Sequence, residues 1–333
     1  MVELAQRLVS RRKSAVSTGA SLPVVLALLA AVVFLVVGSL VSTIFAQQTV
    51  AGLAQGAIFG SLALALVLIY RATEVINFAQ GEMAMATTYI AYQLTLWGLS
   101  YWLAFFVTLP IAFVFGVLVQ LVFVRAVQQS IIAVVIVTVG LFILIDGVVT
   151  WIWGADLKFM AAPFGTTVYH AGGVAFSRQD IGVLAVSIAS VIVLWILFQF
   201  TKLGLAMRAS ALRPAAASLV GVRVNWMLAI GWGLAAVLGA VAGLMTEPTQ
   251  FLQPTMMQAI LLYAFAAAVL GGLESPAGAV IGGLALGVFL NLIGQYVGIA
   301  TPELRLPIAF LVLLAVLLVK PTGLFGRKQV RRV

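Results

Sequence analysis

The sequence predicts an all-α, polytopic transmembrane helical bundle with about ten spans. Of its 333 residues, 64% are hydrophobic and 8% are charged, whereas a soluble domain carries about 25% charged residues. Apolar runs near the length of about 20 residues that crosses a bilayer recur at residues 22–45, 51–70, 75–97, 101–124, 130–153, 181–200, 226–245, 255–270, 277–298 and 306–319. Few residues remain between the runs, so we expect a single transmembrane domain over residues 1–333.

The first apolar run follows a basic N-terminal segment, residues 1–21. A secretory signal peptide is the alternative interpretation, but its apolar region is normally about 7–15 residues long. The run over residues 22–45 is much longer, so we expect an uncleaved first span.

The cationic residues are distributed unevenly along the chain. If the N-terminus is cytoplasmic and every run crosses the membrane, only Lys158, Arg178 and Arg305 fall outside, which leaves 15 of the 18 Lys and Arg residues inside. This asymmetry obeys the positive-inside rule and predicts two cytoplasmic termini, the second being the basic tail 320–333. The net charge of +9 therefore reflects topology in a lipid bilayer, and we expect no nucleic-acid partner.

Catalytic and metal-binding patterns are missing from the sequence. It contains no cysteine and a single histidine, His170, so it lacks thiolate chemistry and a histidine cluster. We expect His170 to be solvated in the outer segment 154–180. The sequence has no GxxxxGK[ST] phosphate loop and no HExxH motif, so we expect a non-enzymatic chain without a cofactor or metal of its own.

One long interruption of apolar sequence combines four cationic residues with a plausible short helix: KLGLAMRASALRPAAASLVGVR, residues 202–223. Pro214 suits the first position of a helix and Gly221 suits the residue just past its end. The three alanines that follow Pro214 are strong helix formers. We therefore predict a short helix, about 10 Å long at 1.5 Å per residue, which either receives a partner protein or lies on the lipid headgroups.

Small residues recur at a spacing of four in several predicted spans. The glycines concerned are Gly52, Gly56 and Gly60; Gly239 and Gly243; Gly278 and Gly282; Gly283 and Gly287. Such spacing lets helix backbones approach closely in lipid, so we expect a compact bundle. When the first and sixth spans are set aside, two sets of four spans begin on opposite sides of the membrane, an arrangement that permits an inverted repeat.

Polar residues within apolar runs usually face a cavity or a partner. The candidates for a translocation path are Asn77, Gln80, Glu82, Asp146, Asn291 and Gln295. Asn77 and Gln80 are three apart, so we expect them on one helix face at the cytoplasmic entry of the third span. The alternative is an interfacial cap in which Arg71 pairs with Glu74. Asp146 either pairs within the bundle or lines the path.

The amides of Asn291 and Gln295 are four residues apart and either bind a polar solute or, as we favour, bridge two helices. Glu247 and Glu303 lie at predicted outer ends of spans, where we expect them to be solvated.

Three blocks of sequence carry a family likeness. They are GLAQGAIFGSLALALVLIYRATEVINFAQGEM, RASALRPAAASLVGV and AVLGGLESPAGAVIGGLALGVF…LPIAFLVLLAVLLVKPTGLFGR, in order over residues 52–327. The chain resembles the membrane permease of the high-affinity branched-chain amino acid ABC importers, and permeases for urea and short amides share nearly the same blocks. The resemblance implies an ABC importer permease fold in the cell (inner) membrane. It also implies that the chain forms half of a translocation path for branched-chain or related hydrophobic amino acids, and that this path works by alternating access.

The resemblance further implies partners and a coupling loop. A second homologous permease, two cytoplasmic ABC ATPases that hold ATP and Mg, and an extracytoplasmic solute-binding protein would complete the importer. Segment 202–223 would then dock on an ATPase, with Arg208, Arg213, Ala215, Ala216, Ala217 and Gly221 in the coupling loop. The chain departs from the family pattern at three places. The family usually has an acid near the position of Ala215 and commonly a histidine at the position of Gln80, and Glu274 interrupts a turn that usually consists of small residues. The resemblance therefore does not identify the exact solute.

Two other classes of protein remain alternatives to an ABC permease. An ion-coupled secondary transporter or channel would need membrane acids such as Asp146 and Glu82. A structural membrane subunit would have no path, and its polar residues would tolerate apolar replacement.

Overall fold

The computed structural model describes residues 32–40, 42–73, 75–127, 131–171, 173–298 and 301–326. Most of the predicted first span, the basic N-terminal segment, Glu74 and the end of the basic tail lie outside the described residues; residues 32–40 are helical. Each of the nine apolar runs after the first contains a helix. These are α3 Thr43–Thr73, α4 Gln80–Leu96, α5 Tyr101–Val127, α6 Ile131–Trp153, α7 Arg178–Phe200, α10 Val224–Gln250, α11 Gln258–Gly271, α12 Pro276–Tyr296 and α13 Arg305–Val319.

Six of the described helices are long and apolar enough to cross a membrane: α3, α5, α6, α7, α10 and α12. In contrast, α4, α11 and α13 have 17, 14 and 15 residues. Two of these shorter helices follow non-helical segments with buried residues. Val75 and Asn77 precede α4, and Leu252 and Met257 precede α11. The count of about ten full crossings therefore stays a prediction.

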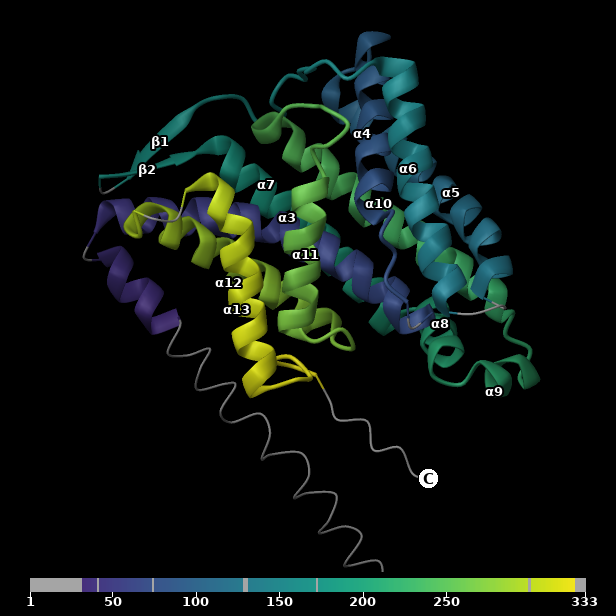
Figure 1. Ribbon diagram of the computed structural model, residues 1–333. Coiled ribbons are helices and arrows are strands. Elements are labelled where there is room, and N and C mark those ends of the chain that lie inside the picture. Colours follow the sequence, from purple (N-terminus) through teal and green to yellow (C-terminus); the bar gives the residue numbers. More distant parts are fainter. Residues whose placement is uncertain are drawn as a thin grey trace, which may run out of the picture.

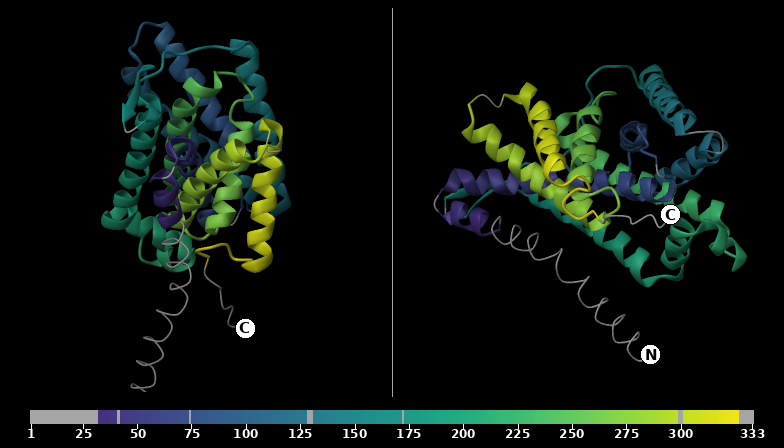
Figure 2. Two further views of the ribbon diagram at one scale, coloured as in Figure 1. Left: turned by 90° about the vertical axis from the view of Figure 1, so that its left-hand side faces the viewer. Right: turned by 60° about the horizontal axis from the view of Figure 1, so that its bottom comes forward.

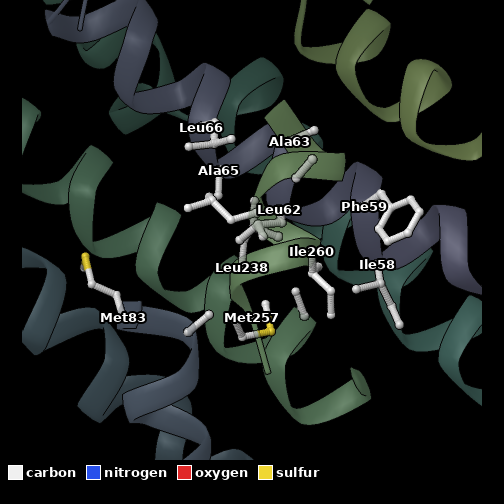
Figure 3. Close-up of a cluster of buried hydrophobic side chains, with 14 of the residues drawn as sticks. Ile58, Phe59, Leu62, Ala63, Ala65, Leu66, Met83, Leu238, Met257 and Ile260 are labelled. Carbon is white, nitrogen blue, oxygen red and sulfur yellow. The ribbon is translucent and has the colours of Figure 1, made fainter. Parts of the chain in front are cut away.

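The helices divide into central and peripheral ones. The most apolar stretch of α3 is 83% buried and that of α10 is 72% buried, whereas the corresponding stretches of α6 and α7 are 22% buried. Figure 3 shows Leu62 of α3 and Leu238 of α10 beside Met257 and Ile260 at the start of α11. The apolar outer faces of α6 and α7 suit a lipid environment, because the hydrocarbon core of a bilayer replaces a protein partner there.

Glycines bring the central helices together, as the sequence predicts. A Cβ atom on Gly56 of α3 would lie 2.7 Å from the carbonyl oxygen of Gly283 on α12, and one on Gly52 would lie 2.6 Å from the Cα atom of Val288. A second close contact joins α5 to α10, where a Cβ on Gly116 would lie 2.5 Å from the Trp232 carbonyl oxygen. Backbone contact of this kind confirms the compact bundle.

A small β-hairpin departs from the all-α expectation. Strands β1 Val168–Ala171 and β2 Val174–Ser177 pair antiparallel, with Val168 opposite Ser177. His170 is exposed on β1, as expected for a solvated histidine. Figures 1 and 2 place this hairpin, near the start of α3, and the short helix α9 Pro214–Leu219 at opposite ends of the molecule, here called the hairpin end and the α9 end.

Candidate functional site

The first polar residues of the candidate path lie where α4 begins. Asn77 precedes the helix, and its Oδ1 accepts the Ala79 N–H at 3.0 Å while its Nδ2 donates to Oε1 of Gln80 at 3.3 Å. The expectation that Asn77 and Gln80 share a helix face is therefore wrong. Its physical reason is local, because an Asn side chain that binds a nearby backbone N–H holds the chain in a turn instead of a helix.

The Gln80 side chain attaches this turn to the central helix α10, near the middle of that helix. Its Nε2 donates to the carbonyl oxygen of Ala235 at 2.9 Å, and Ala235 lies near the midpoint of the 27-residue α10. Gly239 leaves room for the amide, since a Cβ there would lie 2.9 Å from Nε2. The sequence suggests the cytoplasmic entry of a span for these residues, but the structure places them deep in the bundle.

Glu82 is the acid of this region, and it is fully buried in the first turn of α4. Its two carboxylate oxygens make no hydrogen bond of good geometry within the described chain, and the polar side chains that act on it are Asp146 of α6 and Gln258 of α11. Gly81 packs against the start of α11, because a Cβ on it would lie 3.3 Å from the Met257 carbonyl oxygen. The positive ends of two helix dipoles, those of α4 and α11, thus lie beside Glu82.

The polar region continues between α4 and α6. Asp146 is half-buried, and its Oδ1 is buried without a hydrogen-bond partner in the described chain. Further along the same two helices, Trp153 Nε1 donates to Gln93 Oε1 at 2.9 Å, and the rings of Trp153 and Tyr89 lie 5.4 Å apart. The region between α4 and α6 therefore contains polar atoms that are able to form hydrogen bonds with a polar solute.

Asn291 and Gln295 lie along the α3–α12 contact. Asn291 Nδ2 donates to Gln55 Oε1 of α3 at 2.7 Å and to the Gly287 carbonyl oxygen at 3.0 Å. Gln295 Oε1 accepts from Gln48 Nε2 at 3.2 Å. Both amides therefore connect α12 to α3, and their place in a translocation path stays a prediction.

Glu247 was expected to be solvated, and this is wrong. Its side chain is 1% exposed, and Oε1 accepts the Met160 N–H at 2.7 Å. Lys158 and Leu252 exchange backbone hydrogen bonds of 2.9 and 3.0 Å beside it. The outer segment folds back over the end of α10 and covers the acid, whereas Glu303 is exposed as expected. No local signal in the sequence shows this long-range pairing.

The α9 end carries the predicted short helix. Pro214 is the first residue of α9, and Gly221 has φ +85°, a left-handed conformation that favours glycine. The N–H of Val222 donates to the Ala217 carbonyl and that of Gly221 to the Ser218 carbonyl, both at 3.0 Å, so α9 ends in a Schellman motif. These bonds confirm the local prediction for Pro214 and Gly221.

A second helix, α8 Lys202–Leu212, precedes α9 and was missed. Its signal was Thr201, whose hydroxyl caps the helix by accepting the Gly204 N–H at 3.0 Å. Together, α8 and α9 expose apolar side chains, with Leu219 at 88% and Val220 at 79%. Of the coupling-loop candidates, Arg213, Ala215, Ala216 and Gly221 are exposed, Arg208 is half-buried and Ala217 is buried.

Six long apolar helices around a glycine-packed centre define a multi-pass membrane protein. Comparison of the sequence identifies the family. The family described as branched-chain amino acid transport system / permease component matches residues 48–317, and the chain therefore belongs to it.

Two relatives support this assignment. The probable branched-chain amino acid transport permease protein LivH of Methanocaldococcus jannaschii is 32% identical over 80% of this chain and 87% of its own. The high-affinity branched-chain amino acid transport system permease protein LivH of Salmonella typhimurium is 29% identical over 87% of this chain and 98% of its own. The solved structure of PsaBC from Streptococcus pneumoniae in complex with Fab aligns with a TM-score of 0.48 and 13% identity, over 87% of this chain and 97% of that one.

Proposed function

We propose that the chain is the permease subunit of an ABC importer and forms half of the translocation path for branched-chain or related hydrophobic amino acids. Family membership supports a membrane-permease role, and the names of the relatives support the solute class. The chain would alternate between outward and inward access while two ATPases close on ATP and open after hydrolysis. Because the sequence has no phosphate loop, ATP and Mg would be held by those partners.

The exposed surface of α8 and α9 carries the proposal. Leu212, Leu219 and Val220 are at least three-quarters exposed at the α9 end, and Arg213 and Arg223 are exposed among them. Large apolar side chains rimmed by charge mark an interaction surface, and arginines can bind acidic or carbonyl groups of a partner. We assign this surface to a cytoplasmic ATPase and place the α9 end in the cytoplasm. The hairpin end would then face a solute-binding protein.

The buried polar residues Asn77, Gln80 and Glu82 and the half-buried Asp146 are the proposed lining of the path. A zwitterionic amino acid brings one charge of each sign. The acids can attract its ammonium group, and the helix N-termini of α4 and α11 can attract its carboxylate. A transient site suits a permease, since a tight site would slow release and the separate binding protein can supply most of the selectivity.

An inverted repeat is part of the proposal. Helices α3 to α6 would form one unit and α10 to α13 the other, and equivalent pairs of helices are in contact. For example, α3 packs on α12 as α10 packs on α5, and α4 packs on α6 as α11 packs on α13. The shorter helices α4 and α11 would be equivalent, and they meet at the polar residues. This is the place where transporters with inverted repeats bind their solute.

Purification of the tagged chain from mild detergent tests the assignment. The expected result is co-purification of two ATPases and a second permease, with ATPase activity. Leu219→Asp should release the ATPases, while the control Leu96→Asp, at an exposed residue on α4, should retain them. A chain that purifies alone and still moves solute into vesicles without ATP would overturn the proposal.

Two alternatives are separated by the solute and the energy source. If the purified complex takes up urea or a short amide and ignores leucine, the chain is a permease of the related amide type. The buried Glu82 and the half-buried Asp146 favour an ion-coupled transporter as the alternative from another class. In that case, an ion gradient would drive uptake without ATP, and Asp146→Asn would abolish the ion dependence.

A further inference from the structure

A cavity of about 480 Å³ lies among α3, α7, α8, α10 and α12, apart from the polar residues of the proposed path. Of its 20 lining residues, only Arg71, Gln199, Arg208 and Ser210 have polar side chains. The others, including Leu64, Trp195 and Val280, are apolar, glycine or proline. The cavity therefore offers a large apolar volume and a small set of polar groups.

The polar groups gather at one end of the cavity. Arg71 lies in the last turn of α3, while Leu68 and Leu64 lie one and two turns deeper on the same helix. Gln199 is next to the last residue of α7, and Arg208 and Ser210 belong to α8. The charged end thus lies at the α9 end of the bundle, and the apolar part extends toward its middle.

The charged end lacks an acid among the described lining residues. Glu274, outside the cavity lining, attracts Arg71, and Arg208 lies close enough to repel it more weakly. Arg208 donates from Nη1 to Gln199 Oε1 at 3.2 Å. Ser210 is 3% exposed, and its Oγ has no hydrogen-bond partner within the described chain. A buried hydroxyl without a partner is costly, so this end suits a ligand that accepts hydrogen bonds and carries negative charge.

The outer wall of the cavity is formed by the exposed helix α7. Ile192 and Trp195 line the cavity from α7 and are also 48% and 57% exposed. Their exposed surfaces lie on a peripheral helix, which is suited to contact with acyl chains. A lipid from the bilayer can therefore reach the cavity from the side.

We propose that this cavity binds an anionic phospholipid of the cytoplasmic leaflet, with an acyl chain in the apolar part and the phosphate between Arg71, Arg208 and Ser210. Basic pockets between membrane helices on the cytoplasmic side bind such headgroups. A zwitterionic amino acid fits less well, because its ammonium group would meet two guanidinium groups and no acid of the lining. The bound lipid would hold α8 against α3 and α7, so it would support the orientation of the adjacent α9.

The test measures lipid bound to the full chain in its purified complex. The complex is stripped of lipid in detergent and titrated with phosphatidylglycerol, and native mass spectrometry counts the lipid that remains bound. Two arginines near a membrane surface each contribute about fivefold to the affinity for anionic lipid, so R71Q/R208Q should bind about 25-fold more weakly. R223Q, at an exposed arginine outside the cavity lining, is the matched control and should bind as the wild type does.

A second variant keeps both arginines and fills the apolar part. Ala277→Phe should also weaken phosphatidylglycerol binding, while phosphatidylcholine should bind weakly to every variant. Equal phosphatidylglycerol binding in wild type, R71Q/R208Q and A277F would overturn the proposal. If leucine displaces the bound lipid, the cavity belongs to the solute path. If a second permease covers the cavity and keeps lipid out, the cavity is part of a subunit interface. Either result would also overturn the proposal.

Discussion

Glu82 combines full burial with a lack of well-formed hydrogen bonds in the described chain. Asp146 faces it with the same sign of charge, and Gln258 offers one polar side chain. A buried acid that lacks strong partners destabilises a fold, and an acid inside a membrane bundle usually marks a functional site. A transient contact with a solute requires such an acid, because a carboxyl group that is fully paired within the protein has no hydrogen-bonding capacity left for the solute.

Replacement of Glu82 by Gln tests this trade between stability and transport. The variant should unfold at higher temperature, since it removes a poorly paired buried carboxylate at a gain on the order of 1 kcal/mol. Uptake of amino acid by the reconstituted importer should fall. Glu303→Gln, at an exposed acid, is the control and should change stability by less than about 0.5 kcal/mol. A destabilised Glu82→Gln variant with normal uptake would mean that Glu82 has a structural role.

Single residues differ in how far the sequence revealed them. Pro214 and Gly221 were predictable because helix ends depend on neighbouring residues. Glu247 was not, since the segment that buries it begins at Lys158, far away in the chain. Gln80 was recognised as a candidate, but its depth depends on a hydrogen bond to Ala235, 155 residues away.

The helix contacts in this bundle determine at which glycines a Cβ atom can be added. A Cβ on Gly56 would meet the backbone of Gly283 and Leu284 within 2.9 Å, and backbone cannot move aside as a flexible side chain can. At Gly140 of the peripheral helix α6, a Cβ would have no neighbour within 4 Å. The same substitution should therefore have opposite effects on the two helices.

Gly56→Ala should destabilise the chain by about 1–3 kcal/mol, because it forces α12 away from α3. Gly140→Ala should be neutral or stabilise by up to about 1 kcal/mol, since alanine favours the helix. Thermal unfolding of both variants in the same detergent measures the difference. Equal melting temperatures would contradict the close α3–α12 contact.

The role of helix α9 can be tested in the same way, by a glycine substitution with a matched control. Gly221 and Gly98 both follow a helix with a Schellman motif, with φ of +85° and +93°, and a Cβ atom on either would meet no neighbour within 4 Å. Valine at either position should cause backbone strain of roughly 1–2 kcal/mol, because residues with a Cβ atom rarely adopt a left-handed conformation. The two positions differ in place, since Gly98 follows α4 and Gly221 follows α9.

Gly221→Val should uncouple ATP hydrolysis from uptake while the chain still inserts in the membrane, because a disordered end of α9 no longer transmits ATPase movement. Gly98→Val should leave coupling intact. ATPase activity and leucine uptake, measured together in proteoliposomes, give the ratio that decides. Coupled transport by Gly221→Val would argue strongly against docking through α9.

Elements were predictable where a local pattern specifies them. Nine apolar runs became helices because apolar composition and length suffice for a membrane helix. Their lengths were not equally predictable. The run at residues 75–97 loses its first residues to the turn held by Asn77, and the run at 255–270 starts late because the chain after α10 folds back into the bundle. The hairpin was missed because its eight strand residues lie in an irregular outer segment.

At the scale of the whole molecule, the two ends have different chemistry. The hairpin end carries the covered Glu247 and the exposed His170. The α9 end carries the arginines of segment 202–223 and the apolar residues Leu219 and Val220. The coupling surface and the lipid site both require the α9 end to be cytoplasmic, as the distribution of Lys and Arg predicts. Orientation is thus the property on which the other proposals depend.

Cysteine labelling tests the orientation without background, because the sequence has no cysteine. His170→Cys and Ser218→Cys place one exposed thiol at each end of the molecule. A membrane-impermeant maleimide should label Cys at 170 in intact spheroplasts and should label Cys at 218 only after the membrane is opened. The opposite pattern would move the α8–α9 surface outside the cell, where no ATPase has access to ATP, and would exclude both its coupling role and a cytoplasmic-leaflet lipid.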